Sequence, residues 1–208
     1  RGRRRARRPV SICGVSRFEE AYRGTPPWDI GRAQPAVERL ARAGAFQGAV
    51  LDAGCGTGEN ALFLAGLGLE VVGLDQVPAA VERAREKARR RGIAATFLVG
   101  DALRLESLGL TFDAVLDCGL FHTLVDEERP RYAASLAAIT RPGGAVHLMC
   151  FCEEETGAGG PRRVTRGEIG EAFGWGWAVR SVERERFSSH LHPEGARAWL
   201  ARIERLPG

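Results

Sequence analysis

The chain has 208 residues, of which 44% are hydrophobic and 27% are charged, so it can bury one core and is expected to form a single folding unit. Its formal net charge of +4 arises at one end: six of the 30 basic residues fall in the first eight positions, which leaves 24 basic against 26 acidic residues elsewhere. Because no apolar stretch of about 18 residues is present and no signal-peptide core follows the basic start, the sequence argues against a membrane protein and predicts a cytoplasmic one.

Residues 1–8 carry the basic excess and are predicted to form a solvated, disordered arm. This arm could contact nucleic acid without regard to sequence, but the rest of the chain shows no basic and aromatic stripe, so a nucleic-acid partner is not expected. The cysteines show no spacing typical of metal ligands, and we expect reduced thiols and no metal. They are Cys13, Cys55, Cys118, Cys150 and Cys152.

The first predicted elements precede the main repeat of strands and helices. Residues 18–22 and 34–43 have helical spacing, and a loop at 24–31 that is rich in Pro and Gly separates them. We therefore divide the chain into a disordered basic arm (1–8), an N-terminal helical lid segment (9–47) and a core (48–208).

From residue 48 onward, short β-branched runs alternate with amphipathic stretches, which predicts a parallel sheet covered by helices. Strands are predicted at 49–51, 71–74, 96–99, 114–116 and 145–149, with helices at 59–67, 79–91 and 127–140 and a turn at 141–144. A helix at 168–173, a strand at 177–187 and a segment at 196–206 follow; the last favours a strand but also makes acceptable helical turns. The expected fold is a Rossmann-like, doubly wound α/β sheet of about seven mostly parallel strands with helices on both faces.

The most informative motif runs from Leu51 to Asn60, LDAGCGTGEN, directly after the first predicted strand. Its glycines let the backbone approach a ligand and place N–H groups at a helix start. The spacing is G-x-G-x-G, which differs from the G-x-G-x-x-G of pyrophosphate sites. Asp52 enters this loop, and a carboxylate suits the cationic group of a ligand better than a phosphate.

Two further acidic residues follow predicted strands. Asp75 ends the second strand, about 20 residues after the glycine loop, where a carboxylate can accept both hydroxyls of a ribose. Asp101 follows the third strand in Gly100-Asp101-Ala102 and could accept the amine of an adenine, although either aspartate could instead cap a turn or helix. Parallel strands end at one edge of the sheet, so we expect a ligand site there.

Together these motifs resemble the class I S-adenosylmethionine (SAM)-dependent methyltransferases over residues 50–149. The resemblance rests on LDAGCGTG at 51–58, GLD at 73–75, GDA at 100–102 and RPGG at 141–144. It implies SAM as cofactor and S-adenosylhomocysteine (SAH) as product. The segment at 25–35, TPPWDIGRAQP, is similar to the one preceding the core in thiopurine, thiol and halide, and bacterial heterocycle methyltransferases, where it closes over SAM and the acceptor.

The resemblance assigns roles to individual residues. Trp28 would form one wall of the SAM pocket, Gln34 would lie near the cofactor and Tyr22 would line the acceptor side. Asp117 and His122 follow the fourth strand, where the family places residues beside the transferred methyl group. The predicted catalytic residues are therefore Tyr22, Asp117 and His122. The predicted cofactor-binding residues are Trp28, Gln34, Asp52, Gly54, Cys55, Gly56, Thr57, Gly58, Asn60, Asp75, Gln76, Gly100, Asp101, Ala102, Asp117 and Cys118.

The sulfonium methyl group is already activated, so transfer needs mainly a nucleophile held in line with the carbon–sulfur bond. A thiol or a heterocyclic nitrogen needs no dedicated base, whereas a phenol would use His122 or Asp117. We predict a small-molecule acceptor that reacts through a thiol or a heterocyclic nitrogen. We also predict that the protein is a monomer or a homodimer. The alternatives are an O- or C-methyltransferase of a natural product or quinone, a nucleic-acid methyltransferase, and a non-catalytic SAM-binding protein.

Overall fold

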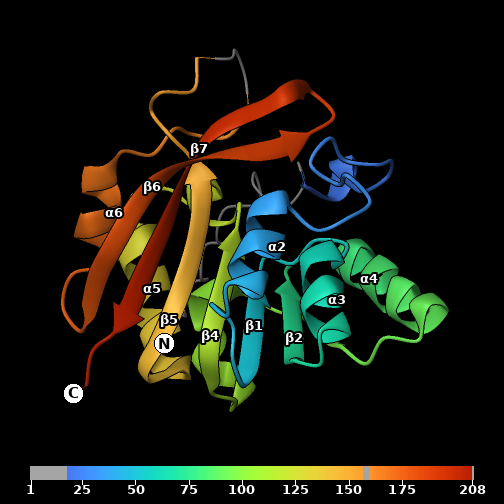
Figure 1. Ribbon diagram of the computed structural model, residues 1–208, viewed down its shortest axis with the longest axis horizontal. Helices are drawn as coiled ribbons and strands as arrows, with labels where there is room; N and C mark the ends of the chain where they lie inside the picture. The colour runs from blue at the N-terminus through green and yellow to red at the C-terminus, as the bar shows by residue number, and fades with distance from the viewer. Residues whose placement is uncertain (1–17, 157–159, 208) are drawn as a thin grey trace, which may run out of the picture.

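The computed structural model describes residues 18–156 and 160–207 (Figure 1). The predicted basic arm and Cys13 lie outside these ranges. Residues 18–21 are helical. The elements that follow are α2 (Pro35–Arg42), β1 (Ala49–Ala53), α3 (Glu59–Gly66), β2 (Glu70–Asp75), α4 (Pro78–Arg91), β3 (Thr96–Val99), the 3₁₀ helix η1 (Ala102–Leu108), β4 (Phe112–Cys118), the 3₁₀ helix η2 (Phe121–Thr123), α5 (Glu128–Ile139), β5 (Thr140–Phe151), α6 (Arg166–Ala172), β6 (Trp177–Ser189) and β7 (His192–Arg205).

The seven strands form one sheet in the order β3-β2-β1-β4-β5-β7-β6. The pairs from β3 to β5 are parallel, and β7 runs antiparallel to both β5 and β6. This confirms the predicted doubly wound, mostly parallel α/β sheet. It also resolves the segment at 196–206 as part of a strand, because β7 lies between two strands whose main-chain groups it pairs.

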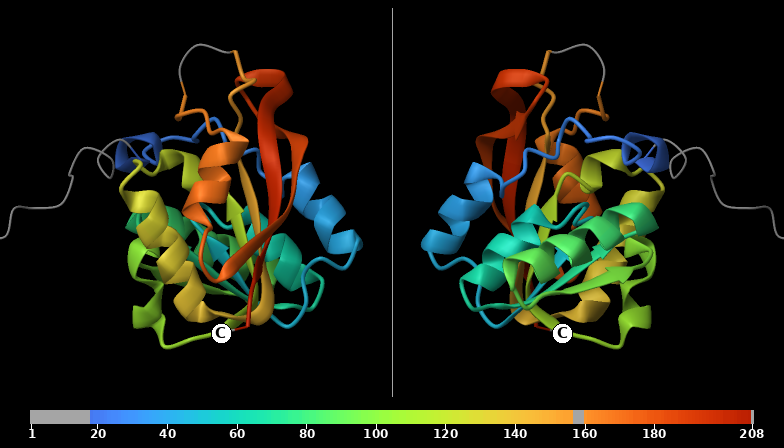
Figure 2. Two further views of the ribbon diagram at one scale, coloured as in Figure 1. Left: turned by 90° about the vertical axis from the view of Figure 1, so that its left-hand side faces the viewer. Right: turned by 90° about the vertical axis from the view of Figure 1, so that its right-hand side faces the viewer.

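Side chains of alternate strand residues pack into two hydrophobic cores, one on each face of the sheet. Val50 and Leu116 point to the core shared with α2, α3 and α4, whereas Leu51 and Val115 point to the core shared with α5 and α6. Figure 2 shows the sheet between these two helical layers. Such two-sided burial explains why the inner strands read as continuous apolar runs.

The boundary between α5 and β5 differs from the prediction. The sequence RPGG at 141–144 predicts a turn with a strand from 145, yet β5 begins at Thr140. Thr140 pairs with Phe112 and Ala145 pairs with Ala114, so the intervening residues form a large irregularity within the strand. Gly143, at φ +81°, supplies the left-handed backbone that this bulge needs.

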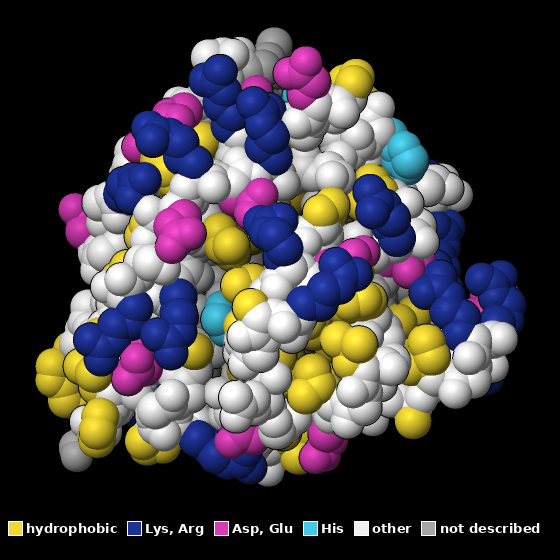
Figure 3. Space-filling view, viewed as in Figure 1, with side chains coloured by type: hydrophobic (Ala, Val, Ile, Leu, Met, Phe, Trp, Pro, Cys, Tyr) yellow, Lys and Arg dark blue, Asp and Glu magenta, His cyan; other side chains and the backbone are white. Residues whose placement is uncertain are grey.

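Charged side chains on the face in Figure 3 are interleaved, with Lys and Arg beside Asp and Glu over most of the surface. Ion pairs account for part of this arrangement, including Arg180 with Glu204 at 3.0 Å and Arg184 with Glu154 at 2.7 Å. No helix within the described ranges is long and apolar enough to cross a bilayer.

Candidate active site

The glycine loop joins β1 to α3 and requires glycine at three positions. Gly54, Gly56 and Gly58 have φ angles of +73°, +55° and +84°, a region that other residues rarely adopt. A Cβ atom would also lie 2.9 Å from the Leu120 Cβ at Gly54 and 2.8 Å from the Tyr22 Oη at Gly56. The loop therefore presents bare backbone at the carboxyl edge of the sheet.

Asp75, at the end of β2, organises this loop. One of its carboxylate oxygens accepts from the Gly56 amide and the other from the Val77 amide, both at 2.9 Å. Burial raises the pKa of Asp75, and these amide hydrogen bonds oppose the shift. Each oxygen keeps a lone pair, so the carboxylate can still accept the ribose hydroxyls for which it is predicted.

Asp52, at the end of β1, is a buried carboxylate without a partner. Only 1% of its surface is exposed, and neither oxygen has a hydrogen-bond partner. Burial raises the pKa of Asp52 to about 7, and the charges of Asp117 and Asp75 add to the shift; the Ala61 amide opposes it without reaching hydrogen-bond geometry. A buried, unpaired carboxylate is costly, and a cationic ligand group beside it would remove that cost. Asp52 thus fits the ammonium group of SAM.

The third acidic strand end is arranged differently. Asp101 is exposed, and its Oδ1 accepts from the Leu103 amide at 2.9 Å, which makes it the N-cap of η1. Gly100 continues the edge, with its amide donating to the Asp75 carbonyl at 3.0 Å. Gln76 is also exposed, and Ala102 is half-buried. The predicted adenine contact therefore lies on the more exposed side of the site.

The N-terminal lid segment places aromatic rings over the glycine loop. Tyr22 is 5% exposed, and its hydroxyl accepts from the Trp28 indole N–H at 3.3 Å. The two rings pack edge to face, with centroids 6.1 Å apart. Burial and the charge of Asp75 raise the pKa of Tyr22, so this hydroxyl stays protonated and cannot serve as a base at neutral pH.

Polar contacts tie the lid to the glycine loop. The Thr57 hydroxyl donates to an Asp29 carboxylate oxygen and accepts from the Lys87 ammonium, both at 2.7 Å. Lys87 also pairs with Glu59 at 2.7 Å. The pKa of Asp29 is lowered by its hydrogen bond from Thr57 and by the lysine charge, although burial, the largest single effect, acts in the opposite direction. The side chain of Thr57, which is predicted to contact the cofactor, thus also joins the glycine loop to the lid.

The β6–β7 hairpin holds the other side of the lid (Figure 1). The Gln34 side chain accepts from the Ser188 amide and donates to the Ser188 carbonyl, both at 2.9 Å. The Gln34 amide also donates to Asn60 at 2.9 Å. The His190 amide donates to the Pro27 carbonyl at 2.9 Å, and its ring contacts the Asp29 carbonyl at 3.1 Å. The sequence prediction missed Ser188, His190, Asp29 and Lys87.

Asp117, at the end of β4, is fully buried and is bound by the turn that follows. Its oxygens accept from the Leu120 amide at 2.9 Å and the Phe121 amide at 3.1 Å. Burial raises the pKa of Asp117 to about 6 against these hydrogen bonds. Cys118 is a half-buried free thiol whose pKa burial raises, and Cys55, Cys150 and Cys152 are buried free thiols.

His122 lies in η2 with 6% of its surface exposed. Its Nδ1 accepts from the Phe151 amide at 3.0 Å. Burial lowers the pKa of His122 to about 3, and the positive charges of Arg129 and Arg163 act in the same direction. The ring is therefore neutral, and the lone pair that a base would use already accepts a hydrogen bond.

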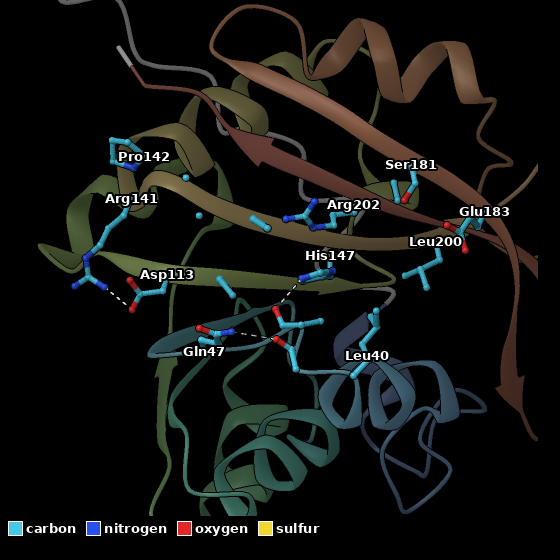
Figure 4. Close-up of a pocket in the computed structure, with 18 residues that line it drawn as sticks. Leu40, Gln47, Asp113, Arg141, Pro142, His147, Ser181, Glu183, Leu200 and Arg202 are labelled. Carbon is cyan, nitrogen blue, oxygen red and sulfur yellow. Dashed lines mark hydrogen bonds and ion pairs between the residues drawn. The ribbon is translucent and has the colours of Figure 1, made fainter.

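A groove lies at the opposite edge of the sheet, beside the bulge of β5 (Figure 4). It measures about 780 Å³. Its polar groups are largely matched to one another: Arg141 pairs with Asp113 at 2.6 Å, and the His147 ring contacts the Ala45 carbonyl at 3.1 Å. This groove stands apart from the glycine loop, and we assign it no ligand. In the described ranges, no group of His, Cys, Asp and Glu side chains is placed to hold a metal ion.

Comparison with known proteins agrees with this geometry. The family model "Methyltransferase domain" matches residues 50–144. The 2-heptyl-1-hydroxyquinolin-4(1H)-one methyltransferase of Mycobacteroides abscessus is 34% identical over 180 residues, which cover 81% of this chain and 79% of the relative. The probable thiol methyltransferase 2 of Arabidopsis thaliana is 32% identical, covering 70% of this chain and 65% of the relative.

Among solved structures, one described as "Conversion of a Disulfide Bond into a Thioacetal Group during Echinomycin Biosynthesis" superposes with a TM-score of 0.84 at 37% identity. It covers 92% of this chain and 91% of its own. The match therefore extends well beyond residues 50–144. With SAM as its cofactor and a small molecule as its acceptor, the chain belongs to the class I SAM-dependent methyltransferases.

Proposed function

We propose that the acceptor carries its own nucleophile, in the form of a thiol sulfur or a heterocyclic heteroatom that is reactive without a protein base. The observation that carries this proposal is the state of the two candidate bases. Asp117 accepts hydrogen bonds from two backbone amides, and His122 accepts one at Nδ1. Asp117 is fully buried, and the basic nitrogen of His122 is already engaged, so neither is placed to deprotonate an acceptor and a phenol of ordinary pKa would react slowly here.

SAM, when bound, supplies an electrophilic methyl group on sulfur. The residues of this chain then bind, orient and exclude water. Asp52 and Asp75 would hold the ammonium and ribose groups, and Tyr22 with Trp28 would cover the reacting end. Positioning of this kind supplies several kcal/mol of the acceleration, on the order of 7–11 in well-oriented systems.

The relatives support the same choice of acceptor. The Arabidopsis relative is named for a thiol, and the structural relative is described by the conversion of a disulfide into a thioacetal, both of them sulfur groups. The Mycobacteroides relative is named for a hydroxyquinolone, whose N-hydroxyl group is acidic. This favours a second candidate, methylation of an acidic oxygen on a nitrogen heterocycle, which likewise needs no base.

A matched pair of acceptors tests the proposal. Thiophenol and phenol share one ring and differ in the acidity of the nucleophile, so we expect thiophenol to be methylated at least ~100-fold faster at pH 7.5 if no base assists. Mass spectrometry of the products with SAM measures both rates, and 2-heptyl-1-hydroxyquinolin-4(1H)-one tests the acidic oxygen. Equal rates for phenol and thiophenol would show that a protein base operates.

The lid contact of Gln34 gives a further prediction. Gln34→Leu removes both hydrogen bonds to Ser188 and leaves that amide and carbonyl without partners, at a cost of about 1–3 kcal/mol per buried group. We expect SAH to dissociate roughly tenfold faster or more because the lid opens more readily. Stopped-flow displacement of SAH measures the rate. Arg39→Ala, which removes an exposed ion pair between α2 and Glu185, is the control, and its dissociation rate should stay near that of the wild type.

A further inference from the structure

The tautomer of His122 is set by the backbone. A backbone amide can only donate, so the Phe151 amide at 3.0 Å requires an unprotonated Nδ1. The proton of the neutral ring must then reside on Nε2. His122 therefore presents a fixed N–H group, and no described residue accepts a hydrogen bond from it.

The ring is held rigidly in that orientation. Phe151 and Phe187 pack against it with centroid distances of 4.9 and 5.8 Å, and the two phenyl rings lie 5.3 Å from each other. A donor that cannot rotate away is preorganised for one direction of approach. Such a donor is available to a ligand atom that can accept a hydrogen bond.

The Nε2 edge faces the end of β4. A Cβ atom on Gly119 would lie 3.6 Å from the His122 Cε1 and 3.7 Å from its Nε2, and Gly119 itself has φ +100° and is half-buried. The side chain of the next residue, Leu120, lies beside Gly54 of the glycine loop, where a Cβ atom on Gly54 would be 2.9 Å from the Leu120 Cβ. The free N–H group thus adjoins the same sheet edge as the cofactor residues, on the side opposite Asp75.

We propose that His122 determines acceptor specificity by donating its Nε2–H to a lone-pair atom of the acceptor. This deepens the function proposed above and rests on it. The substrate class is a planar heteroaromatic or aryl compound in which an oxygen, nitrogen or thiolate sulfur next to or at the methylated atom can accept a hydrogen bond. Compounds that present only N–H donors at that point are rejected, because donor would face donor.

Two substitutions separate this role from a structural one. His122→Asn keeps an acceptor near the position of Nδ1, for the Phe151 amide, but has no group at the position of Nε2. His122→Gln places an amide N–H group near Nε2 and gives up the contact at Nδ1. The proposal predicts that kcat/KM for 2-heptyl-1-hydroxyquinolin-4(1H)-one or thiophenol falls on the order of 10- to 100-fold in His122→Asn and is largely restored in His122→Gln.

The SAH dissociation constant and the midpoint of thermal unfolding are measured for the wild type and both variants. Unchanged SAH binding with the pattern above supports the proposal. Wild-type kcat/KM in His122→Asn with a loss in His122→Gln overturns it, because that pattern belongs to a residue that only supports Phe151. If the wild type methylates neither acceptor while binding SAH, the proposed acceptor class fails. The tautomer is then tested directly, and ¹⁵N spectra that show protonated Nδ1 at pH 7 overturn the inference.

Discussion

Gly56→Val will lower the affinity for SAH by at least ~100-fold. The residue has φ +55°, where a β-branched side chain is strained by about 1–3 kcal/mol, and its Cβ would lie 2.8 Å from the Tyr22 hydroxyl. The backbone must move to relieve both conflicts, which breaks the hydrogen bond from the Gly56 amide to Asp75 and shifts the carboxylate predicted to hold the ribose. Isothermal titration calorimetry measures the loss.

A matched glycine in the same helix-loop unit controls for the mutation itself. Gly66 ends α3, is exposed, and a Cβ there would meet nothing within 4 Å, so Gly66→Val should bind SAH as the wild type does. Asp75→Ala removes the same hydrogen bond from the opposite side and should also abolish binding. Full SAH affinity in both Gly56→Val and Asp75→Ala, with native circular dichroism, would refute the assignment of the glycine loop.

Asp52 should make the stability of the free enzyme fall as the pH rises. Its pKa is raised from 3.8 to about 7, so the folded state holds a proton that the unfolded state has released. Below about pH 4 the group contributes nothing; the destabilisation grows between pH 4 and 7 and is complete above 7, at no more than about 4 kcal/mol. Asp52→Asn resembles the protonated form, so its free energy of unfolding should exceed that of the wild type by several kcal/mol at pH 8 and match it near pH 4.

The same carboxylate should link cofactor binding to proton release. An ammonium group beside Asp52 favours the ionised form, so below pH 7 binding must expel a proton, and the SAH affinity of the wild type should rise by up to about tenfold per pH unit between pH 5 and 7. Asp52→Asn should bind SAH weakly and without this dependence. Calorimetry in two buffers of different ionisation enthalpy counts the protons. A flat affinity in the wild type would mean that Asp52 does not meet the ammonium group.

The fold could be predicted because each helix or strand that packs on a core has apolar residues at a regular spacing. The apolar runs around Val50 and Val71 and the small-residue face of α4 located strands and helices to within a few residues of their observed ends. The bulge at 141–144 was predicted as a turn, since Pro and two glycines have the same composition in both. The two 3₁₀ helices were missed because they are short and lack the spacing of a full helix.

The site was predictable where local sequence determines it and unpredictable where distant segments meet. The three glycines and Asp75 are specified within one strand-loop-strand unit. Nothing near Gln34 indicates Ser188, because the contact uses main-chain atoms, which every residue has. The state of His122 likewise depends on one amide, that of Phe151, and the engagement of Asp117 by the turn after β4 is a matter of backbone conformation. The part that each of these two side chains can play therefore depends on backbone contacts that residue type alone does not reveal.

The contact between the lid and the β6–β7 hairpin also carries a loop-closure cost. Gln34 and Ser188 are 154 positions apart, so joining them closes most of the chain into one loop and costs more entropy than any contact inside a single βαβ unit. Gln34 therefore gains its partner only once the chain has been synthesised through β6.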